Sequence, residues 1–257
     1  MQVKLAAMGL LCALVTACGG DGDGGSNSAP DRIVPPKTLA PEGRWIAKGT
    51  DKDTTLVVLE NGDIWGYATY PNGEVATIHG DAAATGSLLT GKLTLLKYGL
   101  LGLSATDFNA EIVEKESLTI VGPSSFASQG TYDQTYDAAP SPELLAGAYS
   151  GVSTRMRRLG PESISLSSSS GQTVNISATG ELAVDTGAGC VASGSALPRA
   201  TGKDVFDVNF TFQGANCVPS TGTVFSGIAT LEASTGLMVL QTLDNTKAEG
   251  FSFHARK

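Results

Sequence analysis

The residues of this chain that could do chemistry are a turn-like aspartate, scattered pairs of acidic residues and the two histidines. Asp185 follows the apolar run Leu182-Ala183-Val184 and precedes Thr186-Gly187-Ala188. An aspartate that shares a proton with a second carboxylate can activate a water molecule for hydrolysis. Asp and Gly are also favoured where a chain reverses direction. The segment therefore fits either a catalytic loop or a hairpin turn.

The segment from Leu182 to Ala188 resembles the catalytic loop of retroviral-type aspartic proteases. That resemblance implies a hydrolase that gains its second aspartate by dimerising and packs an apolar-apolar-Gly segment behind the site. Leu237-Met238-Val239-Leu240 lacks this glycine, and a hairpin turn is expected just before Cys190. We therefore expect Asp185 to be a turn residue and the protein not to be an enzyme. An aspartic-protease-like hydrolase that uses Asp185 is the alternative.

The other candidate groups do not form a recognisable site. Paired aspartates occur at two places, Asp51 with Asp53 and Asp133 with Asp137. A calcium loop needs several oxygen ligands at close spacing, and no complete loop is present. His79 and His254 stand in strand-like segments, where we expect edge or surface residues, and no Gly-x-Ser-x-Gly or phosphate-binding glycine motif occurs. We expect no metal ion and no cofactor.

The first residues of the chain have the pattern of an export leader. Lys4 provides a positive start, and the apolar run from Leu5 to Val15 is too short to span a bilayer. The run ends in Val15-Thr16-Ala17-Cys18, which resembles the lipobox of bacterial lipoproteins. The resemblance implies a signal peptide over residues 1–17 and acylation of Cys18 with palmitate-type chains, and several such chains anchor a protein stably. An ordinary secretory signal or a membrane helix is the alternative.

The residues after Cys18 predict a flexible tether and indicate in which membrane the protein is anchored. Residues 18–38 are rich first in Gly and Asp and then in Pro, so they cannot bury apolar surface and should stay a flexible tether. In lipoproteins of bacteria with two membranes, an aspartate directly after the cysteine usually marks retention in the inner membrane. Gly19 stands there instead, which implies the outer membrane. The residues do not specify the periplasmic or the surface face.

The charge balance argues against a polyanionic partner. The chain holds 25 acidic against 17 basic residues, a net charge of −8, and loss of Lys4 with the leader makes the remainder more acidic. We therefore expect no nucleic-acid partner. Arg155-Met156-Arg157-Arg158 is the one basic cluster. We expect a solvated loop there, with a contact to phosphate or lipopolysaccharide as the alternative.

Cys190 and Cys217 remain after the leader and the anchor are set aside. An even pair in an oxidising compartment most simply forms a disulfide. A metal site is the alternative, but both histidines are far away in the sequence.

The pattern beyond the tether is that of an all-β protein. Gly is abundant, and runs such as Val205 to Phe212 alternate apolar and polar residues, as half-buried antiparallel strands do. Asn61-Gly62 between two apolar runs is a strong hairpin signal. We predict two small antiparallel β-barrel or β-sandwich domains, residues 39–138 and residues 139–257, the second with one disulfide.

The two halves resemble each other weakly, which suggests a degenerate repeat. Gly43-Arg44-Trp45 corresponds to Gly147-Ala148-Tyr149, and the hairpin after Leu59 corresponds to the one after Ser177. Thr85-Gly86-Ser87-Leu88 would correspond to Ala192-Ser193-Gly194-Ser195-Ala196.

Four aromatic residues gather in the first half, Trp45, Trp65, Tyr67 and Tyr70. Core and cross-strand packing explains them, and a ligand cup or an interface is the alternative. The arrangement loosely resembles surface lipoproteins whose paired small β-domains bind host or nutrient-carrier proteins. We expect a non-enzymatic binding or envelope-interaction module anchored in the outer membrane, its ligand a protein or a small molecule. A structural role in outer-membrane integrity is a further alternative.

Overall fold

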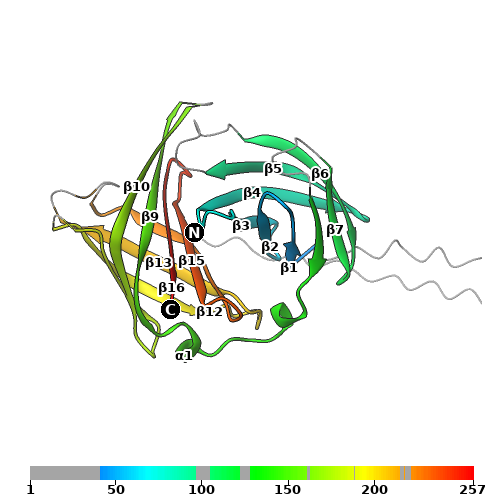
Figure 1. Cartoon of the computed structure of the whole chain (residues 1–257). Helices are drawn as coiled ribbons and strands as arrows, with labels where there is room; N and C mark the ends of the chain where they lie inside the picture. Colours follow the sequence, from blue (N-terminus) through cyan, green and yellow to red (C-terminus); the bar gives the residue numbers. More distant parts are fainter. Residues whose placement is uncertain are drawn as a thin grey trace, which may run out of the picture. The chain divides into compact units, whose positions relative to one another are not determined.

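The computed structural model describes residues 41–96, 105–121, 128–160, 163–187, 189–214, 217 and 221–257. The predicted leader, the predicted lipidation site Cys18 and the predicted tether over residues 18–38 lie outside the described residues. The described part holds strands β1 to β16, which form two closed barrels of eight antiparallel strands each (Figure 1). The predicted all-β class with two small domains is confirmed, and both domains are barrels rather than sandwiches.

Barrel 1 is an up-and-down barrel in which each strand pairs with the next. Its strands are β1 (Gly43–Ala47), β2 (Asp53–Val58), β3 (Asp63–Thr69), β4 (Val75–Thr85), β5 (Leu88–Leu96), β6 (Thr106–Val113), β7 (Ser117–Val121) and β8 (Ser128–Tyr132). It closes where β1 pairs with β8, with Trp45 opposite Tyr132.

Barrel 2 repeats this topology after a short connection. The connection contains the 3-10 helix η1 (Gln134–Asp137) and the helix α1 (Pro142–Leu145), and the predicted boundary between residues 138 and 139 falls within it. The strands are β9 (Gly147–Gly160), β10 (Ser163–Ile176), β11 (Glu181–Asp185), β12 (Val191–Pro198), β13 (Phe206–Gln213), β14 (Val224–Glu232), β15 (Leu237–Asp244) and β16 (Glu249–Arg256). Strand β16 pairs with β9 and closes the barrel.

Two of the three correspondences that suggest a repeat lie at equivalent places in the two barrels. Trp45 and Tyr149 both stand in a first strand and are buried. The second hairpin of each barrel turns at a glycine with positive φ, Gly62 at 86° and Gly180 at 82°, where a side chain would be strained. The third correspondence is wrong, because Gly86 lies in the β4–β5 turn whereas Gly194 lies within β12.

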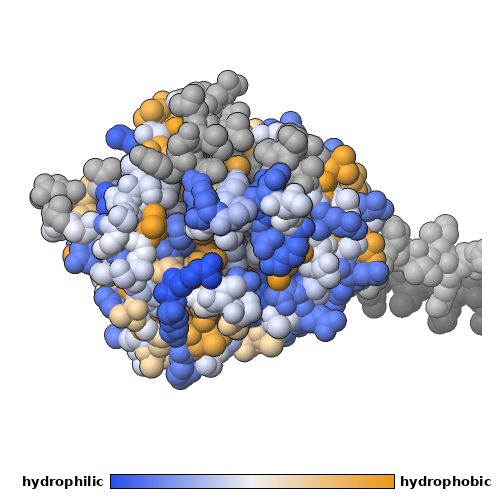
Figure 2. All heavy atoms as spheres, in the orientation of Figure 1, coloured by the Kyte–Doolittle hydropathy of each residue, from blue (hydrophilic) through white to orange (hydrophobic). Residues whose placement is uncertain are grey.

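Side chains fill the interior of both barrels, as is usual for eight strands. In barrel 1, Trp45 meets Tyr132 edge to face with ring centroids 5.1 Å apart. In barrel 2, Phe210 stacks on Phe225 at 5.7 Å, and Phe251 meets Phe210 edge to face. Figure 2 shows a face on which hydrophilic residues predominate and apolar residues form small patches.

Strand β15 explains how the barrels pack on each other, because every one of its residues is buried. Met238 and Leu240 point into the core of barrel 2. Leu237 and Val239, which alternate with them, pack instead against Tyr67 of barrel 1. One face of β15 therefore packs in barrel 2 and the other packs against barrel 1. Because both faces are buried, the first half of the strand, Leu237 to Leu240, is continuously apolar rather than alternating.

The expectation of a solvated loop at Arg155-Met156-Arg157-Arg158 is wrong. These residues lie within β9, which pairs with β10 on one side and with β16 on the other. Met156 is 7% exposed and packs in a hydrophobic cluster with residues of barrel 1. Three of the four residues are charged, so the sequence alone does not reveal that this segment is a strand. The outer face of that strand is covered by barrel 1.

None of the helices among the described residues has the length and apolar character needed to cross a membrane.

Candidate functional site

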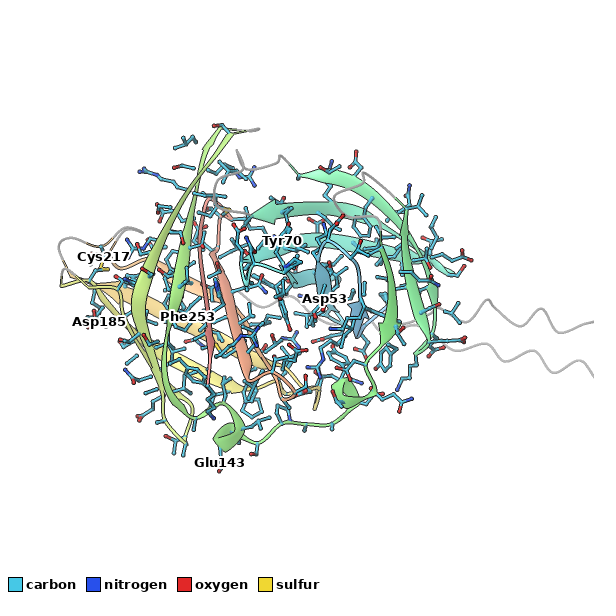
Figure 3. All side chains as sticks on the ribbon, in the orientation of Figure 1. Asp53, Tyr70, Glu143, Asp185, Cys217 and Phe253 are labelled. Carbon is cyan, nitrogen blue, oxygen red and sulfur yellow. A yellow bond between two sulfur atoms is a disulfide. The ribbon has the colours of Figure 1, made fainter. Side chains whose placement is uncertain are left out.

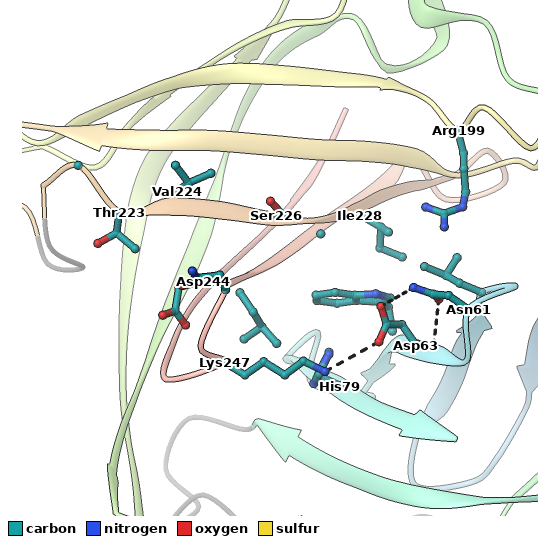
Figure 4. A pocket seen from close by; sticks show the side chains of 16 residues that line it. Asn61, Asp63, His79, Arg199, Thr223, Val224, Ser226, Ile228, Asp244 and Lys247 are labelled. Carbon is teal, nitrogen blue, oxygen red and sulfur yellow. Dashed lines mark hydrogen bonds and ion pairs between the residues drawn. The ribbon is translucent and has the colours of Figure 1, made fainter. Parts of the chain in front are cut away.

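A cleft of about 710 Å³ lies where the two barrels meet (Figure 4). Barrel 1 contributes the β2–β3 hairpin and neighbouring strands, and barrel 2 contributes β14, the end of β15 and the β15–β16 turn. The cleft therefore depends on both barrels being folded and docked.

The floor of the cleft is apolar. It is formed by Leu59 and Trp65 of barrel 1 and by Ile228 and Leu243 of barrel 2, all of them buried. Ile228 and Leu243 belong to the same hydrophobic cluster as Trp65, which fixes the two walls against each other. An apolar floor of this kind can hold the apolar body of a small ligand.

The rim of the cleft carries charge of both signs. Asn61 Nδ2 donates to Asp63 Oδ2 at 2.8 Å, and Lys247 Nζ lies 3.9 Å from Asp63 Oδ1, as the dashed lines in Figure 4 show. The lysine reaches across from barrel 2 to barrel 1. Its side chain is 52% exposed, so the ion pair is weak and the ammonium stays accessible to a ligand.

Asp244 fixes the turn that presents Lys247. Its Oδ1 accepts hydrogen bonds from the backbone N–H groups of Ala248 at 2.7 Å and Glu249 at 2.8 Å. Burial raises the pKa of Asp244, but these bonds and those from Thr246 outweigh it and hold the pKa below its ordinary value. Lys247 itself has φ 56°, a left-handed conformation that the capped turn enforces.

Arg199 closes another side of the cleft and bridges the barrels. Its Nη2 donates to Glu60 Oε1 of barrel 1 at 2.7 Å, and its Nη1 pairs with Asp207 of barrel 2. The side chain is only 14% exposed, so this cation is committed to the interface rather than free for a ligand.

His79 stands beside the floor, with its ring edge to face against Trp65 at 4.6 Å. Burial lowers its pKa to about 4, and the positive charges of Lys247 and Arg158 add to that effect while Asp63 opposes it. The imidazole is therefore neutral at neutral pH and offers one donor and one acceptor. The expectation of an edge or surface residue is wrong for His79, because barrel 2 covers it.

The other residues singled out from the sequence lie elsewhere. Asp185 ends β11, and its Oδ1 accepts from Gly187 N at 2.7 Å, the geometry of a turn aspartate. The predicted Cys190–Cys217 disulfide is confirmed, and Figure 3 shows Asp185 and Cys217 at the same end of barrel 2. His254 is partly buried on β16, and burial lowers its pKa.

Three of the four paired aspartates form ion pairs. Asp53 binds Lys48 at 2.8 Å, and Asp133 binds Arg44 at 2.7 Å. Asp137 binds Lys115, and hydrogen bonds from Lys115 and Lys203 lower its pKa to about 2. Across the described ranges no cluster of His, Cys, Asp and Glu is suited to hold a metal ion.

The aromatic cluster is divided among three environments. Trp45 lies inside barrel 1, Tyr67 packs between the barrels, and Trp65 forms part of the cleft floor, whereas Tyr70 packs partly buried against the cluster that contains Trp65. Packing therefore explains Trp45 and Tyr67, and the alternative of a ligand cup stays a prediction for Trp65. The barrel 2 residues that line the cleft cannot be recognised from the sequence, because Ile228 and Leu243 look like ordinary strand residues.

Comparison of the chain with protein-family models, with curated proteins and with solved structures finds no match.

Proposed function

We propose that this protein is an outer-membrane lipoprotein that acts as a non-enzymatic binding module, and that the cleft between the barrels is its ligand site. The observation that carries the proposal is the cleft itself, with an apolar floor and a rim of both charges. Convergence of a few polar groups around an apolar pocket is typical of small-ligand sites.

The cleft favours binding over nucleophilic catalysis. An activated hydroxyl needs a base within hydrogen-bond reach. No hydrogen bond joins His79 to the hydroxyls of Thr223 and Ser226, which line the cleft among the described residues. A ligand with an apolar body and at least one anionic group matches the floor and the accessible Lys247.

The anchor in this proposal rests on the lipobox and on the length of chain between it and the barrels. Strand β1 begins at Gly43, so the residues from Cys18 onward would form a tether that lets the cleft face away from the bilayer. Cys18→Ser should abolish palmitate labelling and release the protein from the membrane fraction. Continued labelling of Cys18→Ser would refute the anchor.

The cleft is tested by filling it. The exposed Ser226 lines the cleft on β14, whereas Ser150 is also exposed but lies at the other end of barrel 2, on β9. Anilinonaphthalene sulfonate carries an apolar body and an anionic group, so its fluorescence should rise on binding to the wild type. Ser226→Trp should remove most of that rise, and Ser150→Trp should keep it. Equal dye binding by both variants would place the ligand site elsewhere.

A further inference from the structure

A second concave site lies on the inner face of β16, β9 and β10, where the long β9–β10 hairpin extends beyond β11. Arg155 stands opposite Phe251 on β16 and opposite Ser167 on β10. Residues directly opposite each other in an antiparallel pair point to the same face. Since Phe251 belongs to the core of barrel 2, the side chain of Arg155 points to the barrel's inner side.

The residues two positions further along each strand point to the same inner face. Arg157 stands opposite Ser165 on β10 and opposite Glu249 on β16. These side chains line a pocket of about 220 Å³ together with Arg155 and Ser167. None of the residues that line it belongs to the inter-barrel cleft.

Arg155 is unsatisfied in this pocket. Its Nε is buried and has no hydrogen-bond partner among the described residues. Burial lowers the pKa of Arg155, and the structure describes no acidic group that compensates. Arg155 as a whole is only partly buried, so its guanidinium remains accessible from solvent, and the buried Nε without a partner is a donor that an anion from outside can satisfy.

The rest of the pocket adds donors and little opposing charge. Arg157 is 66% exposed, and its contact with Glu249, 3.8 Å from Nε to Oε1, is too long for a hydrogen bond. The hydroxyls of Ser165 and Ser167 are exposed and can donate as well as accept. Of the described residues that line the pocket, one is acidic, Glu249, and two are arginines.

We propose that this pocket binds a phosphate group or a similar oxyanion. A guanidinium matches the oxygens of a phosphate in pairs, and serine hydroxyls supply further donors. The pocket is smaller than the roughly 300–1,000 Å³ typical of drug-sized ligands, which suits a compact anion. The phosphate is either free or the headgroup of a lipid, and the proposal is independent of the function assigned to the cleft.

The test is a calorimetric titration of the purified full chain in a neutral detergent. The probes are inorganic phosphate and the short-chain lipid dihexanoyl phosphatidic acid, with chloride at equal ionic strength as the reference anion. Arg155→Gln should weaken binding of the phosphate probe at least about tenfold, or ~1.4 kcal/mol. Arg256→Gln, at the opposite end of β16, is the charge-matched control and should bind as the wild type does.

Two further variants keep the test decisive whether or not Arg155→Gln folds. Arg155→Lys keeps the charge but loses the paired donors, so its affinity should fall between those of the wild type and Arg155→Gln. Ser167→Ala alters an exposed position and should weaken binding several-fold with the melting temperature unchanged. Arg155→Gln should itself melt no lower than the wild type without phosphate, because it removes a partly buried charge whose Nε has no hydrogen-bond partner.

The two probes separate the sources of the phosphate. Binding of inorganic phosphate supports a free anion as ligand, and binding of the lipid alone supports a headgroup. The proposal is overturned if neither probe binds more tightly than chloride, or if Arg155→Gln or Ser167→Ala, when folded, binds as tightly as the wild type.

Discussion

Replacement of Arg44 by Met should destabilise the docked pair of barrels more than any surface ion-pair change. Arg44 lies on β1 of barrel 1 and is 7% exposed. Its guanidinium binds Asp133 at 2.7 Å, Asp204 of barrel 2 at 2.8 Å, the carbonyl oxygen of Asp204 at 3.3 Å and the hydroxyl of Thr135. Burial lowers the pKa of Arg44, but the two aspartates outweigh that and raise it.

The magnitude follows from what the change leaves behind. Removing one partner of a buried ion pair destabilises by roughly 3–5 kcal/mol. Asp133 keeps hydrogen bonds from the backbone N–H and hydroxyl of Thr135, and both aspartates are 18% exposed and can gain water. We therefore expect a loss near the lower bound, about 3 kcal/mol. Met retains most of the aliphatic packing, so the loss reports the charge.

The assay is urea unfolding monitored by tryptophan fluorescence. Trp45 reports the interior of barrel 1, and Trp65 reports the cleft between the barrels. Lys48→Met, which removes an exposed ion pair with Asp53, is the control and should cost less than about 1 kcal/mol. Adding Asp204→Asn to Arg44→Met should restore part of the loss. Equal destabilisation by Arg44→Met and Lys48→Met would refute the reasoning.

Three other predictions address His79, the disulfide and Asp185. Since the folded pKa of His79 is about 4 and its ordinary value is 6.5, the unfolded chain takes up the proton first. Stability should therefore fall as the pH drops from about 6.5 to 4, by at most ~3 kcal/mol, and urea midpoints of His79→Gln should lack this component. Replacing Cys190 and Cys217 by Ser should lower the free energy of unfolding by about 3.5 kcal/mol, because the disulfide closes a loop of 27 residues. Two free thiols at these positions in the oxidised wild type would contradict the disulfide. Asp185→Asn keeps the oxygen that accepts from Gly187 and should leave the melting temperature unchanged, and a pepstatin-sensitive protease activity lost in this variant would contradict a binding role.

Local features of the fold could be predicted from the sequence, whereas contacts between barrels could not. The Asn61-Gly62 hairpin and the alternation of β13 need only neighbouring residues to be recognised. The disulfide could be predicted from the even number of remaining cysteines and from the oxidising compartment that the predicted leader implies. The sequence predicts a loop around Arg155 where the structure has a strand, because the contacts of that strand come from barrel 1 on one face and from other strands of barrel 2 on the other.

The cleft shows the same limit. Trp65 and His79 are adjacent in the sheet of barrel 1, opposite each other in the β3–β4 pairing. Ile228 and Leu243, from β14 and β15, complete the floor only after the second barrel has docked. No spacing in a single sequence encodes which outer face of one barrel meets which outer face of another.

The sharing of β15 between two cores has a consequence for the order in which the barrels fold. Every strand of barrel 1 pairs with its neighbour in sequence, so this barrel can close before the strands of barrel 2 have paired. Until residues 237–244 are in place, Tyr67 and its neighbours on the outer face have nothing to cover them. The half-folded chain thus carries an apolar patch that attracts holdase chaperones and other half-folded copies. Completion of the last strands removes it, so the finished protein should be far less aggregation-prone than any chain truncated before β15.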